Sequence, residues 1–98
     1  MKIISNFENG RLELAVSGRL DANTAPELKT ALETGLEGVT ELVLDFSGLE
    51  YVSSAGLRVL LFARKTMNRQ GKMVIRHVND TVREIFDITG FLDILTVE

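Results

Sequence analysis

Apolar and polar residues recur with two periods along this chain, and their alternation predicts its secondary structure. Short apolar runs, alternating or continuous, predict strands, whereas apolar residues three or four positions apart predict amphipathic helices. Strands are expected at Lys2–Phe7, Arg11–Ser17, Glu41–Phe46, Lys72–Arg76 and Ile94–Val97. Helices are expected from Thr24 to about Leu36, from about Ser54 to about Gln70 and from about Val82 to Thr89. The order β-β-α-β-α-β-α-β is typical of an α/β domain.

The first two expected strands are joined by Asn9-Gly10, and Asn-Gly is the strongest short hairpin signal. In the second strand Leu12, Leu14 and Val16 alternate with less apolar residues, so one face should be buried. Helices separate the later strands, which requires parallel pairing with crossover connections. We therefore expect a single domain over residues 1–98, with a mixed β-sheet made of an N-terminal hairpin plus parallel strands.

Capping patterns predict where the helices begin and end. Thr24–Glu27 and Thr81–Glu84 both have the spacing of a capping box, and Asn79 or Asp80 are alternative caps for the last helix. Gly90 follows that helix as expected for a C-terminal glycine.

The junction between the third strand and the second helix carries the clearest candidate chemistry. Leu42–Phe46 predicts a strand buried on both faces, after which the chain should turn through Ser47-Gly48 and an acidic corner at Glu50. Ser53 and Ser54 open the next helix, where the first turn leaves backbone N–H groups unpaired. One serine is enough for an N-cap, so the second hydroxyl should be free.

Two small residues, Ala55 and Gly56, follow the serines and leave the free hydroxyl accessible. A phosphoryl group on it would be stabilised by the helix N-terminus and would add about 1.5 to 2 negative charges. Asp21 and Glu50 are expected at the same end of the sheet, so phosphorylation would concentrate negative charge there without changing the fold. A plain N-cap for the serines and a simple turn role for Asp21 stay open as alternatives.

Composition excludes several classes of function. The chain has 98 residues, 45% of them hydrophobic, no Cys, and a formal charge of −3 without a Lys or Arg cluster. We therefore expect no disulfide or thiolate metal site, no direct nucleic-acid binding and no membrane span. The N-terminus lacks the long apolar segment of a signal peptide, which favours a cytoplasmic protein.

Catalysis is the weaker hypothesis. The single histidine, His77, is expected to be a partly exposed residue at a strand end, with no nucleophile or carboxylate pattern nearby. Gly48 and Gly56 fit neither the Walker nor the dinucleotide pattern, so no cofactor is expected. A nucleotide-binding domain stays open as a third hypothesis, which micromolar ATP or GTP binding would support.

Several motifs, in this order and spacing, resemble the STAS domain family, which includes the bacterial anti-sigma factor antagonists. The resemblance covers Ile3 to about Val97 and rests on Gly18–Asp21, Leu42–Ser47, Tyr51–Leu57, Gly71–Met73, Val82–Phe86 and Thr89–Phe91. It implies a non-enzymatic module that binds an anti-sigma factor with serine kinase activity while unphosphorylated. It further implies that phosphorylation releases the partner, that a serine phosphatase resets the module, and that sigma-factor-dependent transcription is thereby regulated.

By position in the motif, the resemblance implies phosphorylation at Ser54. The best-known members carry Asp immediately before the modified serine, and this chain has Ser53 there, so Ser53 is the alternative acceptor. The expected partner-binding residues are Asp21, Asn23, Thr24, Ser53, Ser54, Ala55, Gly56 and Arg58. The rival function is a constitutive subunit of a transport or stressosome-like signalling complex that is never phosphorylated.

Overall fold

The computed structural model describes residues 1–98, which form four strands and three α-helices. The elements are β1 (Lys2–Glu8), β2 (Arg11–Leu20), α1 (Ala25–Gly35), β3 (Glu41–Val52), α2 (Ser54–Met67), β4 (Lys72–Arg76), α3 (Asp80–Ile88) and a short 3-10 helix, η1 (Phe91–Asp93). The predicted alternation of strands and helices is confirmed up to α3.

The sheet is mixed, with the strands in the order β1-β2-β3-β4. β1 and β2 pair antiparallel across a two-residue turn, whose Asn9 and Gly10 both have positive φ, at 51° and 79°. Two positive φ values are the requirement of the type I′ turn that matches strand twist. The β2–β3 and β3–β4 pairs are parallel, so the predicted N-terminal hairpin plus parallel strands is confirmed.

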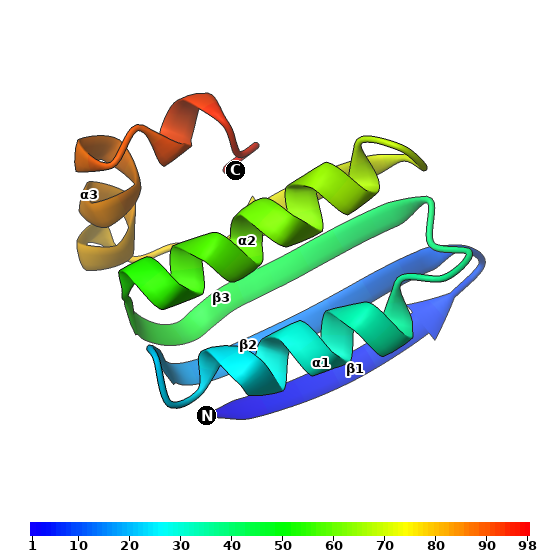
Figure 1. The fold of residues 1–98 in the computed structure, drawn as a ribbon, viewed down its shortest axis with the longest axis horizontal. Coiled ribbons are helices and arrows are strands. Elements are labelled where there is room, and N and C mark those ends of the chain that lie inside the picture. The colour runs from blue at the N-terminus through cyan, green and yellow to red at the C-terminus, as the bar shows by residue number, and fades with distance from the viewer.

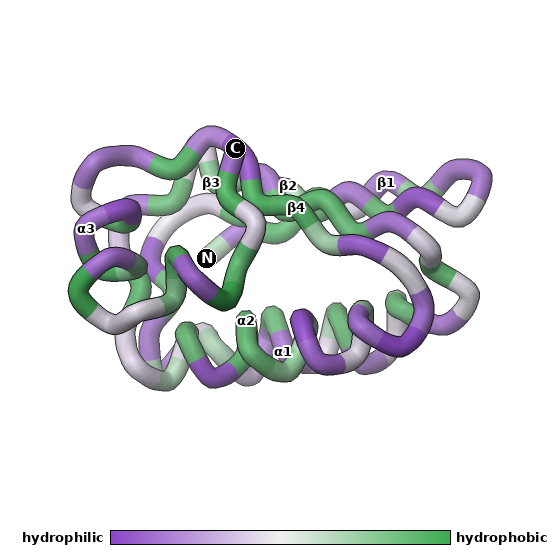
Figure 2. The backbone as a smooth tube through the Cα atoms, turned by 90° about the horizontal axis from the view of Figure 1, so that it is seen from above, coloured by the Kyte–Doolittle hydropathy of each residue, from purple (hydrophilic) through white to green (hydrophobic).

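α1 and α2 lie side by side on one face of the sheet, and α3 stands at one end (Figures 1 and 2). The predicted alternation in β2 is confirmed, because Leu12, Leu14 and Val16 are buried between the sheet and these helices. β3 is buried on both faces at its centre. Leu42 and Leu44 belong to the core under the helices, while Val43, on the opposite face, is only 1% exposed.

β2 and β3 are both longer than predicted. The sequence placed their ends at Ser17 and Phe46, but pairing continues through two register shifts to Leu20↔Val52. The expected turn at Ser47-Gly48 is therefore an irregular stretch of strand. A Cβ on Gly48 would lie 2.7 Å from that of Ser17, so the glycine is required for close strand approach rather than for a turn.

Two predicted capping boxes are wrong. Thr24 precedes α1 but its side chain makes no cap hydrogen bond, and Thr81 lies inside α3. The N-cap of α3 is Asn79, one of the alternatives, and its side-chain oxygen accepts from the Val82 N–H at 2.8 Å. The Asn79 amide also donates to the Leu49 carbonyl at 3.0 Å, which ties α3 to β3.

The predicted final strand at Ile94–Val97 is wrong. The chain forms η1 after Gly90, and the segment that follows makes only an isolated parallel bridge between Ile75 and Val97. Leu95 is buried, at 5% exposure, so this apolar segment caps the core instead of extending the sheet. Hydrophobic spacing alone does not distinguish these two ways of burying the same residues.

Candidate functional site

The candidate residues meet at the carboxyl ends of β2 and β3. These strands are parallel neighbours, and the Ser53 N–H donates to the Leu20 carbonyl at 2.8 Å. The hydrogen bond places Asp21, which follows β2, beside the start of α2. Gly56 permits this approach, because a Cβ there would lie 2.7 Å from the Leu20 side chain and 3.0 Å from its carbonyl oxygen.

The two serines at the start of α2 have different environments. Ser53 is the N-cap, is half-buried, and its hydroxyl oxygen accepts from the Gly56 N–H at 3.4 Å. Ser54 is the first residue of α2, is exposed, and its hydroxyl makes no hydrogen bond within the chain. The predicted division between one capping serine and one free serine is therefore confirmed as geometry.

The connection from β2 to α1 is closed by its own side chains. The Asp21 carboxylate accepts from the N–H groups of Asn23 and Thr24 at 3.0 and 3.2 Å. The Thr24 hydroxyl donates to the Arg19 carbonyl at 2.7 Å and accepts from the Asp21 N–H at 2.9 Å. Desolvation raises the pKa of Asp21, but these N–H groups, the Thr24 hydroxyl and Arg19 outweigh it, and the pKa lies below its ordinary value.

The charge at this corner is more mixed than the sequence suggested. Glu50 is exposed on the same end of the sheet as Asp21, as expected. Arg19, however, lies 3.9 Å from the Asp21 carboxylate and 4.5 Å from the centre of the Tyr51 ring. The unmodified corner therefore contains a neutralising arginine beside its acidic groups.

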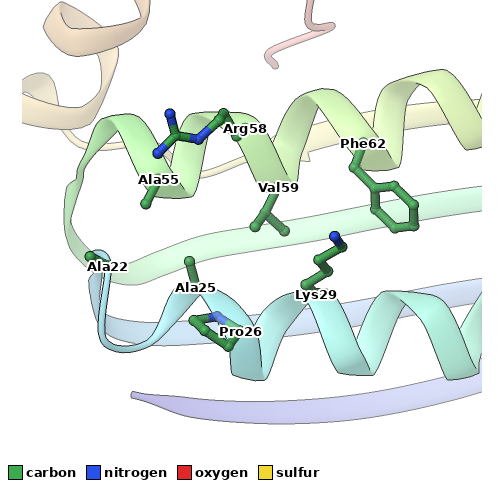
Figure 3. Close-up of a pocket in the computed structure, with 8 residues that line it drawn as sticks. All are labelled: Ala22, Ala25, Pro26, Lys29, Ala55, Arg58, Val59 and Phe62. Atoms are coloured by element: carbon green, nitrogen blue, oxygen red, sulfur yellow. The ribbon is translucent and has the colours of Figure 1, made fainter.

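A groove of about 330 Å³ lies between α1 and α2 (Figure 3), and its lining includes Ala55, the residue that follows Ser54. One wall consists of Ala22, Ala25, Pro26 and Lys29, and the other of Ala55, Arg58, Val59 and Phe62. Arg58 and Ala55, predicted for partner binding, both line it. Val59 is a buried core residue and Phe62 packs against the core, so the groove exposes only the outer part of their apolar surface.

The Asp45–His77 pair was missed in the sequence. His77 Nδ1 lies 3.0 Å from Asp45 Oδ1, and His77 is exposed, as predicted, with a φ of 62°. Asp45 also accepts from the Ser47 N–H at 2.9 Å. This hydrogen bond, assisted by His77 and opposed by partial burial, lowers the pKa of Asp45. Pairing of β3 with β4 places Asp45 opposite Arg76, the last residue of β4, and so beside His77, which is far from it in the sequence.

No group of three or more acidic or histidine side chains lies close enough to hold a metal ion. None of the helices is both long enough and apolar enough to cross a bilayer.

Comparison with known proteins fixes the family. The family model described as the STAS domain matches residues 2–98. The chain belongs to the STAS domain family. Two relatives of this STAS domain are named anti-sigma factor antagonists. BtrV of Bordetella bronchiseptica is 36% identical, over 99% of this chain and 85% of its own length. The anti-sigma-B factor antagonist of Listeria monocytogenes is 34% identical, over 97% and 85%.

The same fold occurs in SpoIIAA of Bacillus, an anti-sigma factor antagonist whose structure is known in two forms. The unphosphorylated form has a TM-score of 0.80 at 18% identity, covering 99% of this STAS domain and 88% of SpoIIAA. The phosphorylated form has a TM-score of 0.76 at 16% identity, with 99% and 91% covered.

Proposed function

We propose that this STAS domain is an anti-sigma factor antagonist that binds an anti-sigma factor with serine kinase activity and is switched off by phosphorylation of Ser54. The observation that carries the proposal is the exposed, unpaired Ser54 hydroxyl at the N-terminus of a helix that Ser53 already caps. The names of the Bordetella and Listeria relatives support the antagonist function, and the phosphorylated form of SpoIIAA supports the switch.

Ser54 suits reversible modification because the fold does not use its side chain. A phosphoryl group can extend into solvent near the unpaired N–H groups of α2 and is stabilised by the positive end of the helix dipole. It adds about 1.5 to 2 negative charges at a surface that a partner would cover. Ser53 is the poorer acceptor, since it is half-buried and its oxygen caps the helix.

The partner surface consists of the residues around this hydroxyl: Asp21, Asn23, Thr24, Ser53, Ser54, Ala55, Gly56 and Arg58. Nearly complete switching between bound and free requires about 5.5 kcal/mol of differential affinity. A charge that stays in water at the rim of an interface does not supply that much. The phosphate must therefore lie inside the contact area, where desolvation makes it costly.

The test is phosphorylation by candidate serine-kinase anti-sigma factors from the same genome, followed by mass-spectrometric mapping. We expect one phosphate, on Ser54, in the native chain and in Ser53→Ala, and none in Ser54→Ala. Modification of Ser54→Ala to the native extent, or phosphate on Ser53 alone, rejects Ser54 as the site. Stable binding without any phosphorylation would favour the constitutive-subunit alternative, and absence of binding would reject the antagonist function.

A further inference from the structure

The groove between α1 and α2 combines an apolar floor with a positive rim. Ala25, Ala55 and Val59 leave apolar surface open between the helices (Figure 3). Lys29 and Arg58 stand on opposite walls, and no acidic residue lines the groove. The rim is therefore cationic in a chain whose net charge is −3.

Both rim cations are free to meet a partner. Lys29 and Arg58 are exposed, and neither is in an ion pair, whereas Arg11, Arg19 and Arg76 all are. The Lys29 ammonium lies 5.5 Å from the centre of the Phe62 ring, which leaves its hydrogen-bonding protons available. A groove of this kind fits a segment with apolar side chains flanked by carboxylates.

Arg58 also connects the groove to Ser54. The two residues are four positions apart on α2, about one turn, which is the spacing at which helix side chains interact. In Figure 3 the Arg58 side chain extends toward the N-terminal end of α2, over the turn that holds Ala55. A guanidinium there can pair in bidentate fashion with a phosphate on Ser54, and it then no longer offers its charge to the groove.

We propose that this groove is the docking site for an acidic, apolar segment of the anti-sigma partner, and that Arg58 transmits phosphorylation of Ser54 to it. This inference rests on the proposed function, since it names how the partner binds and how the phosphate weakens binding. The occupant is a protein segment because the groove shares Ala55 and Arg58 with the partner surface proposed around Ser54, so one partner can cover both.

Two synthetic helical peptides provide the probe. They share the same leucines at positions i, i+3 and i+4, and differ only in their flanking residues, which are glutamates in one and lysines in the other. Each is titrated into the isotope-labelled chain and followed by amide chemical shifts. We expect saturable shifts at groove residues such as Lys29, Val59 and Phe62 with the glutamate peptide. The lysine peptide should bind about ten-fold more weakly, because two rim attractions become repulsions.

The same titration on the chain carrying phosphoserine at position 54 tests the role of Arg58. Phosphorylation should weaken the binding of the glutamate peptide by about ten-fold, as expected if one strong charge pair is lost. In Arg58→Gln the phosphate should have much less effect, and in Lys65→Gln, which removes an exposed cation of α2 outside the groove, the full effect should persist. The phosphate's own titration, followed by ³¹P resonance, should shift to lower pH when Arg58 is present.

No saturable binding at millimolar peptide, equal binding of the two peptides, or shifts on another face would overturn the docking site. A phosphate effect of equal size in Arg58→Gln and the native chain would overturn the role of Arg58. These outcomes are separable from failure of the proposed function, because the phosphate is installed synthetically and no kinase is used. A chain that is phosphorylated by its partner but ignores both peptides would refute only the groove.

Discussion

The chain enters α1 and α2 at the carboxyl ends of the neighbouring strands β2 and β3, but the two turns use their polar side chains differently. Before α1, the Asp21 carboxylate and the Thr24 hydroxyl are both occupied by backbone groups. Before α2, the Ser53 oxygen is occupied and the Ser54 hydroxyl is not. The turn before α1 uses the polar side chains of Asp21 and Thr24 in hydrogen bonds, while the start of α2 leaves the Ser54 hydroxyl without a partner.

This difference shows how a small domain can present an exposed hydroxyl that its own stability does not require. A side chain that the fold uses cannot be modified freely, because its hydrogen bonds are lost with the change. Here the Ser53 side chain caps α2 and the Ser53 N–H is bound to the Leu20 carbonyl, so the start of α2 is held without the Ser54 side chain.

The largest effect on stability is expected at the contact between Gly56 and Leu20, which joins the two turns. Gly56→Ala should lower the free energy of unfolding by about 1–3 kcal/mol, because its Cβ would lie 2.7 Å from Leu20 and force the helix away from β2. Gly35→Ala is the matched control at the end of α1, where a Cβ would meet Leu12 at an ordinary 3.4 Å. Chemical denaturation should show no loss in Gly35→Ala; equal losses in both variants would contradict the proposed close approach.

Removal of the hydroxyl before α1 should be the next largest effect. Thr24→Val keeps the shape of the side chain but leaves the Arg19 carbonyl and the Asp21 N–H without their partner. We expect a loss of about 1–2 kcal/mol in the free energy of unfolding, measured by urea denaturation. A loss below about 0.5 kcal/mol, the usual range for surface changes, would show that the turn is not closed in this way.

Substitution of Ser53 and of Ser54 should have different effects on the free energy of unfolding. Ser53→Ala removes the N-cap of α2 and should cost about 1 kcal/mol. Ser54→Ala removes an exposed hydroxyl without a partner and should stay within about 0.5 kcal/mol of the native chain. The same urea titrations measure both. If Ser54→Ala were the more destabilising variant, the Ser54 hydroxyl would contribute to the stability of the fold, contrary to this account.

The smallest expected effect is the contribution of Asp21, in the turn before α1, to the pH dependence of stability. The pKa of Asp21 is below its ordinary value of 3.8 in the folded chain, so the unfolded chain binds more protons on acidification. The stability that Asp21 contributes is complete above that ordinary value and is lost as the pH falls through its folded pKa. Asp21→Asn should therefore show a shallower fall in unfolding free energy between about pH 5 and 2. An unchanged slope would contradict the hydrogen-bonded carboxylate.

Much of this contrast was predictable from the sequence, because it depends on local chemistry. Ser53 and Ser54 precede a helix with a clear apolar stripe, and a cap requires only one hydroxyl. The Asn9-Gly10 hairpin and the buried centre of β3 follow from equally local patterns. The assignment of the family rests on motifs spread along the chain, and the family model confirms it.

The parts that were missed depend on tertiary contacts. Thr24 has the spacing of a capping residue, but Arg19 and Asp21 compete for its hydroxyl once β2 extends to Leu20. Val97 finds a strand partner only at Ile75, because η1 redirects the chain before it. The groove and the Asp45–His77 pair join residues from different elements, so no short stretch of sequence contains them.

We propose that phosphorylation of Ser54 ends partner binding without altering the fold. The most direct measurement is the calorimetric affinity of the anti-sigma partner for the native chain and for the chain with phosphoserine at position 54. The thermal unfolding of both chains is recorded in parallel. We expect the phosphorylated chain to bind about 10⁴-fold more weakly, as complete switching requires, and to unfold at nearly the same temperature. Equal affinities, or a phosphorylated chain that has lost its native fold, would contradict the claim.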